Sequence, residues 1–415
     1  MEFRGERTGA NTRDVGLSNA QNLADCLRAH ARTGGRAART ARRRGYERVG
    51  AVINVEHGAL SAFEQHVLAS TELCIQQLRG FGHMGAHDVG VGEIHLADLI
   101  NRIRFKIVDL GKNLVLQELE ANGIPFAFDA VIGRGGLVKP IPGGVYAVNE
   151  AMKQDTLHAM RTHACNLGGL IAAELAASLP DCPAFIADPG VVDELEDVAR
   201  ISGSPLMPKI TIWHALNQKA IARRFAKEQG TKYEELDLII CHLGGGISIA
   251  VHQHGKAIDA NNALDGEGPF SPERAGTLPA GQLIDICYSG QFTKDELKKR
   301  ISGRAGLTAH LGTTDVPAII KAIEEGDKKA ELILDAMIYN VAKAIGGAAT
   351  VLYGKVDAIL LTGGIAYSDY IISRLKKRIS FLAPIHVYPG EGEMESLAFN
   401  ALGALRGELP VQIYK

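Results

Sequence analysis

Hydrophobic positions along the chain follow strand-like and helix-like patterns in turn, and the clearest strand pattern lies near the middle. The apolar runs Leu238–Leu243 and Ile247–Val251 flank three consecutive glycines, and Lys256–Ala260 follows a His254–Gly255 turn. Short apolar runs bounded by turn residues are typical of strands. These three runs therefore predict an antiparallel meander.

Elements of alternating type surround the meander. Further strands are predicted at residues 50–54, 128–132, 183–187, 356–361 and 385–388, with a weaker one at 58–68. Apolar periodicity and capping residues predict helices at residues 112–122, 148–160, 166–178, 209–228, 279–287, 293–301, 315–325, 328–352, 367–377 and 393–405. Strands that alternate with helices, together with one meander, predict an α/β protein with mixed sheets.

Composition narrows the class of protein. A chain of 415 residues is long enough for two domains, and a net charge of −2 gives no reason to expect nucleic acid or a membrane surface as partner. No stretch approaches about 18 uninterrupted apolar residues, and no secretory segment opens the chain. The cysteines form no C-x-x-C pair, so we expect most of them to be small buried side chains in a reducing cytoplasm. They are Cys26, Cys74, Cys165, Cys182, Cys241 and Cys287.

The opening segment differs from the rest of the chain. All 20 lysines lie at or beyond Lys106, whereas 14 of the 25 arginines precede it. Residues 31–48, ARTGGRAARTARRRGYER, have no apolar period, and we predict that residues 1–48 form a disordered, solvated extension. A nucleic-acid arm is disfavoured by the absence of interleaved aromatic residues, and a transit peptide by four early acidic residues. A wrong start or a shifted reading frame also explains the break in lysine and arginine usage.

Three glycine-rich turns follow predicted strands, at Gly133–Gly136, Gly244–Gly246 and Gly363–Gly364. Glycines remove side chains from a turn, so backbone N–H groups there can converge on a phosphate. Each turn alone is also compatible with a flexible hairpin or a tight strand-to-helix connection. Three in one chain favour a ligand with several phosphates, such as a nucleotide.

Charged and imidazole side chains at these turns supply candidate chemistry. Arg134 lies between glycines, where a guanidinium can bind an anion or form a structural ion pair. Asp188 ends a strand and is suited to Mg²⁺ or to capping a helix. Three acidic residues lie near the C-terminus, at Glu391, Glu393 and Glu395. Their spacing favours a solvent-exposed face, although one of the carboxylates could reach a metal.

The histidines divide into two sets. His163, His214 and His242 have glycines, aromatic residues or buried strands as neighbours and are candidates for a site, although a lone histidine is more often a core residue. His252 and His254 flank a hairpin tip, and we expect both to be exposed.

Long motifs resemble the butyrate kinases of the acetate kinase family, within the superfamily of sugar kinases, Hsp70 and actin. The resemblance covers residues 113–407. Its motifs are GRGGLVKPIPGG (133–144), DPGVVDELEDVARISG (188–203), WHALNQK (213–219), HLGGGIS (242–248), NNALDGEGPFSPERAG (261–276) and LTGGIAYS (361–368). The NNALDGEGPFSPER stretch favours butyrate kinase over acetate kinase.

The resemblance implies two ribonuclease-H-like (actin-like ATPase) domains with a nucleotide cleft between them. We place the first domain at residues 49–190 with the C-terminal segment 394–415, and the second at residues 191–393. By the family pattern, Arg134 and Arg274 hold the substrate carboxylate and the transferring phosphoryl group. His214 stabilises the transition state, His163 is a second active-site histidine, and Asp188 and Glu393 place Mg²⁺.

The same pattern assigns the nucleotide contacts. His242, Gly244, Gly245 and Gly246 belong to the phosphate hairpin, and Thr362, Gly363 and Gly364 to the adenosine turn. The implied reaction is butanoate plus ATP giving butanoyl phosphate and ADP, with acetate, propionate or a branched acid as alternative acceptors. The family's oligomeric state leads us to expect a homo-oligomer.

One family motif is absent. Butyrate kinases open with an INPGSTSTK-like phosphate loop, whereas Ile53 and Asn54 are followed here by VEHGALSAFEQ. No lysine precedes Lys106 that could replace the lysine of this loop. Asn54 is therefore only a weak candidate metal residue, and a catalytically impaired nucleotide-binding protein is the alternative to an active kinase.

Overall fold

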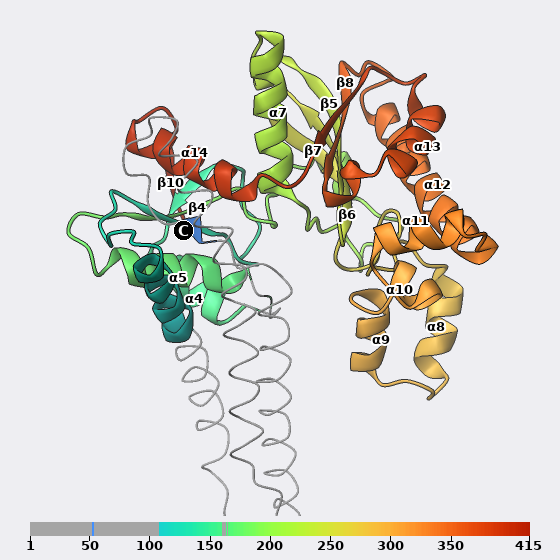
Figure 1. Ribbon diagram of the computed structural model, residues 1–415, viewed down its shortest axis with the longest axis horizontal. Coiled ribbons are helices and arrows are strands. Elements are labelled where there is room, and N and C mark those ends of the chain that lie inside the picture. The colour runs from blue at the N-terminus through green and yellow to red at the C-terminus, as the bar shows by residue number, and fades with distance from the viewer. Residues whose placement is uncertain (1–51, 54–107, 160–162, 164) are drawn as a thin grey trace, which may run out of the picture. The chain divides into compact units, whose positions relative to one another are not determined.

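The computed structural model describes residues 52–53, 108–159, 163 and 165–415. These residues form two compact units, and each is described separately (Figure 1). The first contains the described residues up to Val138 together with Val145–Ala187 and Leu397–Lys415. The second contains Lys139–Gly144 and Asp188–Ser396.

The first unit contains a five-stranded mixed sheet. In spatial order its strands are β1 (Val52–Ile53), β2 (Val131–Arg134), β4 (Ala184–Ala187), β3 (Val145–Ala147) and β10 (Val411–Ile413). β1 and β4 pair parallel to β2, β3 is antiparallel to β4, and β10 runs parallel to β3. The short strands β3 and β10 have no counterpart among the sequence predictions, because three residues are too few to show a period.

Helices cover this sheet. Residues 108–121 form a helix that ends before Gly123, which has a φ of 61° and thus the left-handed conformation of a C-terminal glycine cap. The other helices of the unit are α4 (Glu150–Leu157) and α5 (Asn166–Ala176). α5 is buried along most of its length and packs on β2 and β4, with Ile171 and Leu175 in the core.

The second unit is built on the predicted meander. Its sheet has the order β7 (Lys256–Ala260), β6 (Ile247–Gln253), β5 (Asp237–Leu243), β8 (Ala358–Gly363) and β9 (Ile385–Pro389). β5, β6 and β7 are antiparallel neighbours, and β8 and β9 extend the sheet in parallel with β5. The predicted meander and the mixed α/β class are therefore confirmed.

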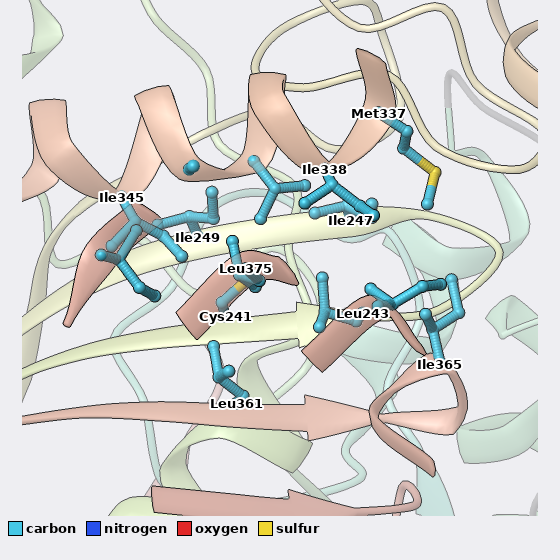
Figure 2. Packing of buried hydrophobic residues seen from close by; sticks show 14 of the residues in the cluster. Cys241, Leu243, Ile247, Ile249, Met337, Ile338, Ile345, Leu361, Ile365 and Leu375 are labelled. Carbon is cyan, nitrogen blue, oxygen red and sulfur yellow. The ribbon is translucent and has the colours of Figure 1, made fainter. Parts of the chain in front are cut away.

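Helices lie on both faces of this sheet because successive residues of β5 point to opposite faces and are apolar on both. Ile239, Cys241 and Leu243 face a core that contains α12 (Lys328–Val351) and α13 (Asp369–Ile379). Figure 2 shows Ile338 and Ile345 of α12 packed against β6 at Ile247 and Ile249. The alternate residues Leu238 and Ile240 pack instead with α7 (Ala215–Gln229).

α12 is the only helix in the described part of the chain that is long and apolar enough to cross a membrane. Eight of its residues are buried in the second unit, among them Leu334, Met337 and Val341. A helix that contributes this many side chains to a core is a core helix. The sequence left open whether the apolar residues of this helix line a core or an interface. The structure places these eight in the core, whereas Leu332 and Tyr339 of the same helix are exposed.

Shorter helices complete the second unit and lead back to the first. They are α6 (Asp197–Arg200), η1 (Tyr233–Glu235), α8 (Ala280–Tyr288), α9 (Lys294–Ile301), α10 (Gly306–Leu311), α11 (Val316–Glu324), η2 (Gly364–Tyr367) and α14 (Glu393–Leu405). The helix predicted at 209–228 begins only at Ala215, since Pro205 and Pro208 precede a segment without helix. The weak strand predicted at 58–68 lies outside the described residues.

Candidate active site

The N-terminus of α7 brings several polar side chains into the core of the second unit. His214 is the N-cap residue of this helix. Asn217, Gln218 and Lys219 follow within one turn, and their exposed fractions are only 0%, 0% and 3%. Residues three and four apart share one face of a helix, so Asn217 and Gln218 lie on the side of His214. Buried polar groups require hydrogen-bond partners, and each of these has one.

Two of the candidate histidines are in direct contact. The imidazole rings of His214 and His242 stack with their centroids 3.8 Å apart and their planes 8° from parallel. His242 is fully buried near the end of β5, and its Nδ1 lies 2.8 Å from Asn217 Oδ1. Since Asn217 Nδ2 donates to the carbonyl of Glu391, its Oδ1 must accept, and His242 Nδ1 therefore carries a hydrogen.

His214 is held from the other side by β6. Its Nδ1 lies 2.8 Å from the hydroxyl oxygen of Ser248, and its main-chain N–H donates to the same oxygen. Gln218 Nε2 also donates to Ser248 Oγ over 2.9 Å. The ring of His214 is thus fixed by a helix, a strand and a stacking neighbour.

The glycine hairpin between β5 and β6 holds an arginine against its backbone. A Cβ atom on Gly246 would lie 2.1 Å from Nη1 of Arg274, so a side chain there would displace the guanidinium. Arg274 Nη1 donates to the carbonyl of Ala263, and Ser271 Oγ donates to the carbonyl of Gly245. Gly245 is exposed at the tip, and a Cβ atom there would lie no closer than 3.7 Å to another side chain, that of Glu273. The hairpin therefore presents a cation and an accessible backbone together.

A second glycine turn ends β8. Gly363 has a φ of 90°, and a Cβ atom there would lie 2.3 Å from the carbonyl oxygen of Leu243, so this glycine serves the close packing of β8 on β5. Gly364 has open space where its side chain would be. The fully buried Thr362 donates to the carbonyl of Gly390 and fixes the turn. Of the two glycines, Gly364 is the one whose backbone a flat ligand can approach.

Asp188 is buried and already has two protein partners. Its Oδ1 accepts from the N–H of Gly144 over 2.7 Å, and its Oδ2 lies 3.2 Å from Arg223 Nη1. Its φ of 39° is in the left-handed region, which non-glycine residues seldom adopt. No helix begins here, so the helix-cap interpretation is wrong. Each carboxylate oxygen keeps further acceptor capacity for a metal-bound water.

The remaining candidates lie in the first unit. Gly133 at the end of β2 and Gly168 in α5 touch so closely that a Cβ atom on Gly133 would lie 2.1 Å from the carbonyl oxygen of Gly168. This contact places the half-buried Arg134 beside the start of α5. His163 Nδ1 lies 2.9 Å from Cys165 Sγ in the segment that enters the same helix. Arg134 and His163 thus belong to neighbouring parts of one unit.

Several expectations need correction. His252 is fully buried rather than exposed, and its ring bonds Tyr233 and Gln218. Cys287 is exposed, because α8 buries none of its residues. Glu393 is buried, whereas the side chain of Glu391 is 46% exposed. Asn54 lies outside the described residues.

The WHALNQK motif did not by itself reveal what its polar residues do. Asn217 orients His242, while Gln218 and Ser248 hold His214. The signal was present, since asparagine and glutamine three and four residues after a histidine share its helix face. Ser248 gave no such signal, because its role depends on a contact between α7 and β6.

Comparisons with known proteins show which proteins the chain is similar to. The model of the acetokinase family matches residues 212–384. A probable butyrate kinase of Phocaeicola vulgatus is 57% identical over 304 residues, which are 73% of this chain and 86% of that protein. Among solved structures, an acetate kinase of Porphyromonas gingivalis has a TM-score of 0.58 at 19% identity, covering 67% of this chain and 78% of its own. A propionate kinase of Francisella tularensis has a TM-score of 0.57 at 18% identity, covering 73% and 83%.

Proposed function

The chain belongs to the acetokinase family, and on that premise we propose that it phosphorylates butanoate, giving butanoyl phosphate and ADP from ATP. Membership makes it a phosphotransferase whose acceptor is a carboxyl group, with ATP and ADP as the other substrates. Its fold is that of the two-domain acetate kinases. The choice of butanoate as the acceptor is supported by the 57% identity to a probable butyrate kinase.

The observation that carries the proposed chemistry is the gathering of donors at the hairpin between β5 and β6. His214, Arg274 and the tip glycine Gly245 come together around the β5–β6 hairpin, although 60 residues separate the first two. Convergent N–H groups, a guanidinium and an imidazole suit a phosphoryl group whose three equatorial oxygens carry the developing charge. A core packing role does not require such a set.

The reaction requires no covalent bond between the protein and the substrates. A carboxylate oxygen attacks the γ-phosphorus of ATP, the bond from phosphorus to the β,γ-bridging oxygen breaks, and ADP departs with the electron pair. A carboxylate is already anionic at neutral pH, so no general base is needed. The protein must instead bring two anions together, and we assign that task to Arg134, Arg274 and His214.

The residues present also fit Mg²⁺ that arrives with the nucleotide. The described residues contain no group of three or more His, Cys, Asp or Glu side chains able to hold a metal alone. Mg²⁺ usually binds through one or two carboxylates, with phosphate oxygens and waters completing its shell. Asp188 and Glu393, both buried acids, would be those carboxylates. Bound there, Mg²⁺ would neutralise phosphate charge.

We further propose a homo-oligomeric, cytoplasmic enzyme without a nucleic-acid or membrane partner. These points rest on the chain's balanced charge and on its family. Light scattering at micromolar concentration tests the assembly, and a monomer would contradict it.

The experiment for the function is acyl hydroxamate formation by the full chain. With ATP, Mg²⁺ and butanoate we expect hydroxylamine to trap butanoyl phosphate, and a panel of acetate, propionate and branched acids to give lower kcat/KM. Higher kcat/KM for another acid would replace the substrate while keeping the reaction. ATP binding without any turnover would instead favour the impaired nucleotide-binding protein that the N-terminal sequence suggests.

A further inference from the structure

A chain of hydrogen bonds runs from the buried hydroxyl of Tyr233 in η1 to the ring of His214. In order it links Tyr233, His252, Gln218, Ser248 and His214. Apart from His214 these side chains are buried, and together they come from η1, β6 and α7 of the second unit. The successive distances are 2.7, 3.1, 2.9 and 2.8 Å. Because every link is a good hydrogen bond, the direction of each hydrogen can be worked out.

Gln218 fixes the direction at the centre. Its Nε2 lies 3.1 Å from the main-chain carbonyl of Ser248, and a carbonyl can only accept. The amide nitrogen therefore faces Ser248, and the amide oxygen faces His252. It follows that Nε2 of His252 carries a hydrogen and donates it to Gln218 Oε1.

The far end of the chain agrees with this direction. Burial and the nearby cations Lys219 and Arg223 hold the pKa of His252 well below its usual value, so the ring is neutral. With a hydrogen on Nε2, its Nδ1 must accept. Burial raises the pKa of Tyr233, which keeps the phenol protonated, and its hydroxyl donates to that nitrogen.

At the other end of the chain, the hydrogen bonds of Ser248 leave one arrangement of hydrogens between Ser248 and His214. Ser248 Oγ receives hydrogens from Gln218 Nε2 and from the main-chain N–H of His214, neither of which can accept. Its two lone pairs are thereby used, and its own hydrogen is directed to Nδ1 of His214, 2.8 Å away. A neutral imidazole that accepts at Nδ1 carries its hydrogen at Nε2.

We propose that Ser248 and Gln218 are positioning residues that hold His214 as the neutral Nε2–H tautomer, so that the ring offers a hydrogen-bond donor on the side away from Ser248. The stacked ring of His242 shows the opposite assignment, with its hydrogen on Nδ1. Two imidazolium ions could not stack 3.8 Å apart without strong repulsion, and a neutral His214 avoids it. The part of the proposal that concerns turnover rests on the proposed kinase function.

The tautomer can be tested without turnover. In the full chain labelled with ¹⁵N-histidine, a two-bond ¹⁵N–¹H correlation distinguishes protonated from bare ring nitrogens, and the signal of His214 is the one lost in His214→Asn. We expect Nδ1 bare and Nε2 protonated in the resting protein. A signal averaged over both tautomers, or Nδ1 protonated, would overturn the proposal whether or not the chain is an active kinase.

Two substitutions test the cause. Ser248→Ala removes the hydroxyl and should give His214 mixed tautomers. Gln218→Glu is nearly isosteric but can accept from both neighbours, so the hydrogen of Ser248 should turn to the new carboxylate and His214 Nδ1 should become the donor. An unchanged His214 signal in both variants would overturn the proposal. If circular dichroism shows that Gln218→Glu does not fold, Gln218→Met removes both hydrogen bonds without a charge and should give mixed tautomers.

Thr211→Val is the matched control. Thr211 is also buried and precedes His214 by three residues, but its hydroxyl has no hydrogen-bond partner among the described residues. It should leave the tautomer and kcat unchanged. Ser248→Ala and Gln218→Glu should lower kcat by about 10- to 100-fold, the usual cost of losing an orienting partner, with the KM for ATP changed by less than about twofold. An equal loss of kcat in Thr211→Val would show general damage to packing and overturn the assignment.

Discussion

The guanidinium of Arg274 occupies the space that a side chain at Gly246 would fill, with Nη1 2.1 Å from the position of the missing Cβ atom. The triple glycine of the hairpin therefore has two functions. Gly246 makes room for a cation, and Gly245 leaves the tip open. A guanidinium beside a glycine-rich hairpin can bind a phosphoryl group together with the backbone N–H groups of the hairpin.

Replacement of Arg274 should impair turnover more than nucleotide binding. We expect Arg274→Ala to lower kcat by about 10²–10³, because its charge acts where negative charge develops in the transition state. The dissociation constant of ATP should stay nearly the same when measured by titration calorimetry. Arg224→Ala is the control, since Arg224 is exposed and, within the described part of the chain, its guanidinium pairs with Glu228 and lies over the ring of Tyr388. Wild-type turnover in Arg274→Ala would remove Arg274 from the site.

Gly246→Ala should act through Arg274. The added methyl group displaces the guanidinium, so kcat should fall toward that of Arg274→Ala. In a double-mutant cycle, Gly246→Ala should cost little more once Arg274 is already alanine. Gly281→Ala is the control for the substitution itself, because Gly281 lies in α8, away from the hairpin, and a Cβ atom there would meet no atom within 4 Å. Additive losses in the double variant would show that Gly246 acts independently of the arginine.

The stability of the second unit should fall in mild acid through His252. Its pKa is held well below the ordinary 6.5 by burial and by Lys219 and Arg223. Below pH 6.5 the unfolded chain binds a proton that the folded chain cannot, so the contribution of His252 is complete above that pH and is lost as the pH falls. The slope is at most about 1.4 kcal/mol per pH unit.

Urea unfolding between pH 7.5 and pH 5.5 measures this effect. The stability difference between wild type and His252→Gln should shrink as the pH falls. His254→Asn, at the exposed hairpin tip, should keep the wild-type slope. Parallel pH profiles for wild type and His252→Gln would contradict the prediction.

Replacement of Asp188 should raise the Mg²⁺ concentration that the enzyme needs for activity. Asp188→Asn retains an oxygen for the N–H of Gly144 and tolerates the left-handed backbone, but it loses the charge. We expect the Mg²⁺ concentration for half-maximal activity to rise about tenfold or more. Asp193→Asn is the control, since Asp193 lies in the same segment and pairs with Arg200. A lower melting temperature with an unchanged Mg²⁺ requirement would make Asp188 purely structural.

Local patterns were sufficient for the meander and the glycine turns, which depend on residues close in sequence. The burial and the contacts of individual side chains depend on tertiary packing, which the sequence patterns do not show. His252 looked like a hairpin-tip residue, yet β6 continues past it and buries it beneath Tyr233 and Trp213. Gly246 looked like a phosphate glycine, although its immediate neighbour is Arg274, 28 residues further along. Contacts of this range cannot be deduced from periodicity or turn chemistry.

The most direct test of the account is a ³¹P NMR measurement of the full chain with ATP, Mg²⁺ and butanoate. We expect a new acyl phosphate resonance that grows in step with ADP, and we expect the acyl phosphate to regenerate ATP when ADP is added in excess. Its appearance would be consistent with transfer of the γ-phosphoryl group to the carboxylate. ADP accompanied only by inorganic phosphate, or bound ATP that never turns over, would contradict it.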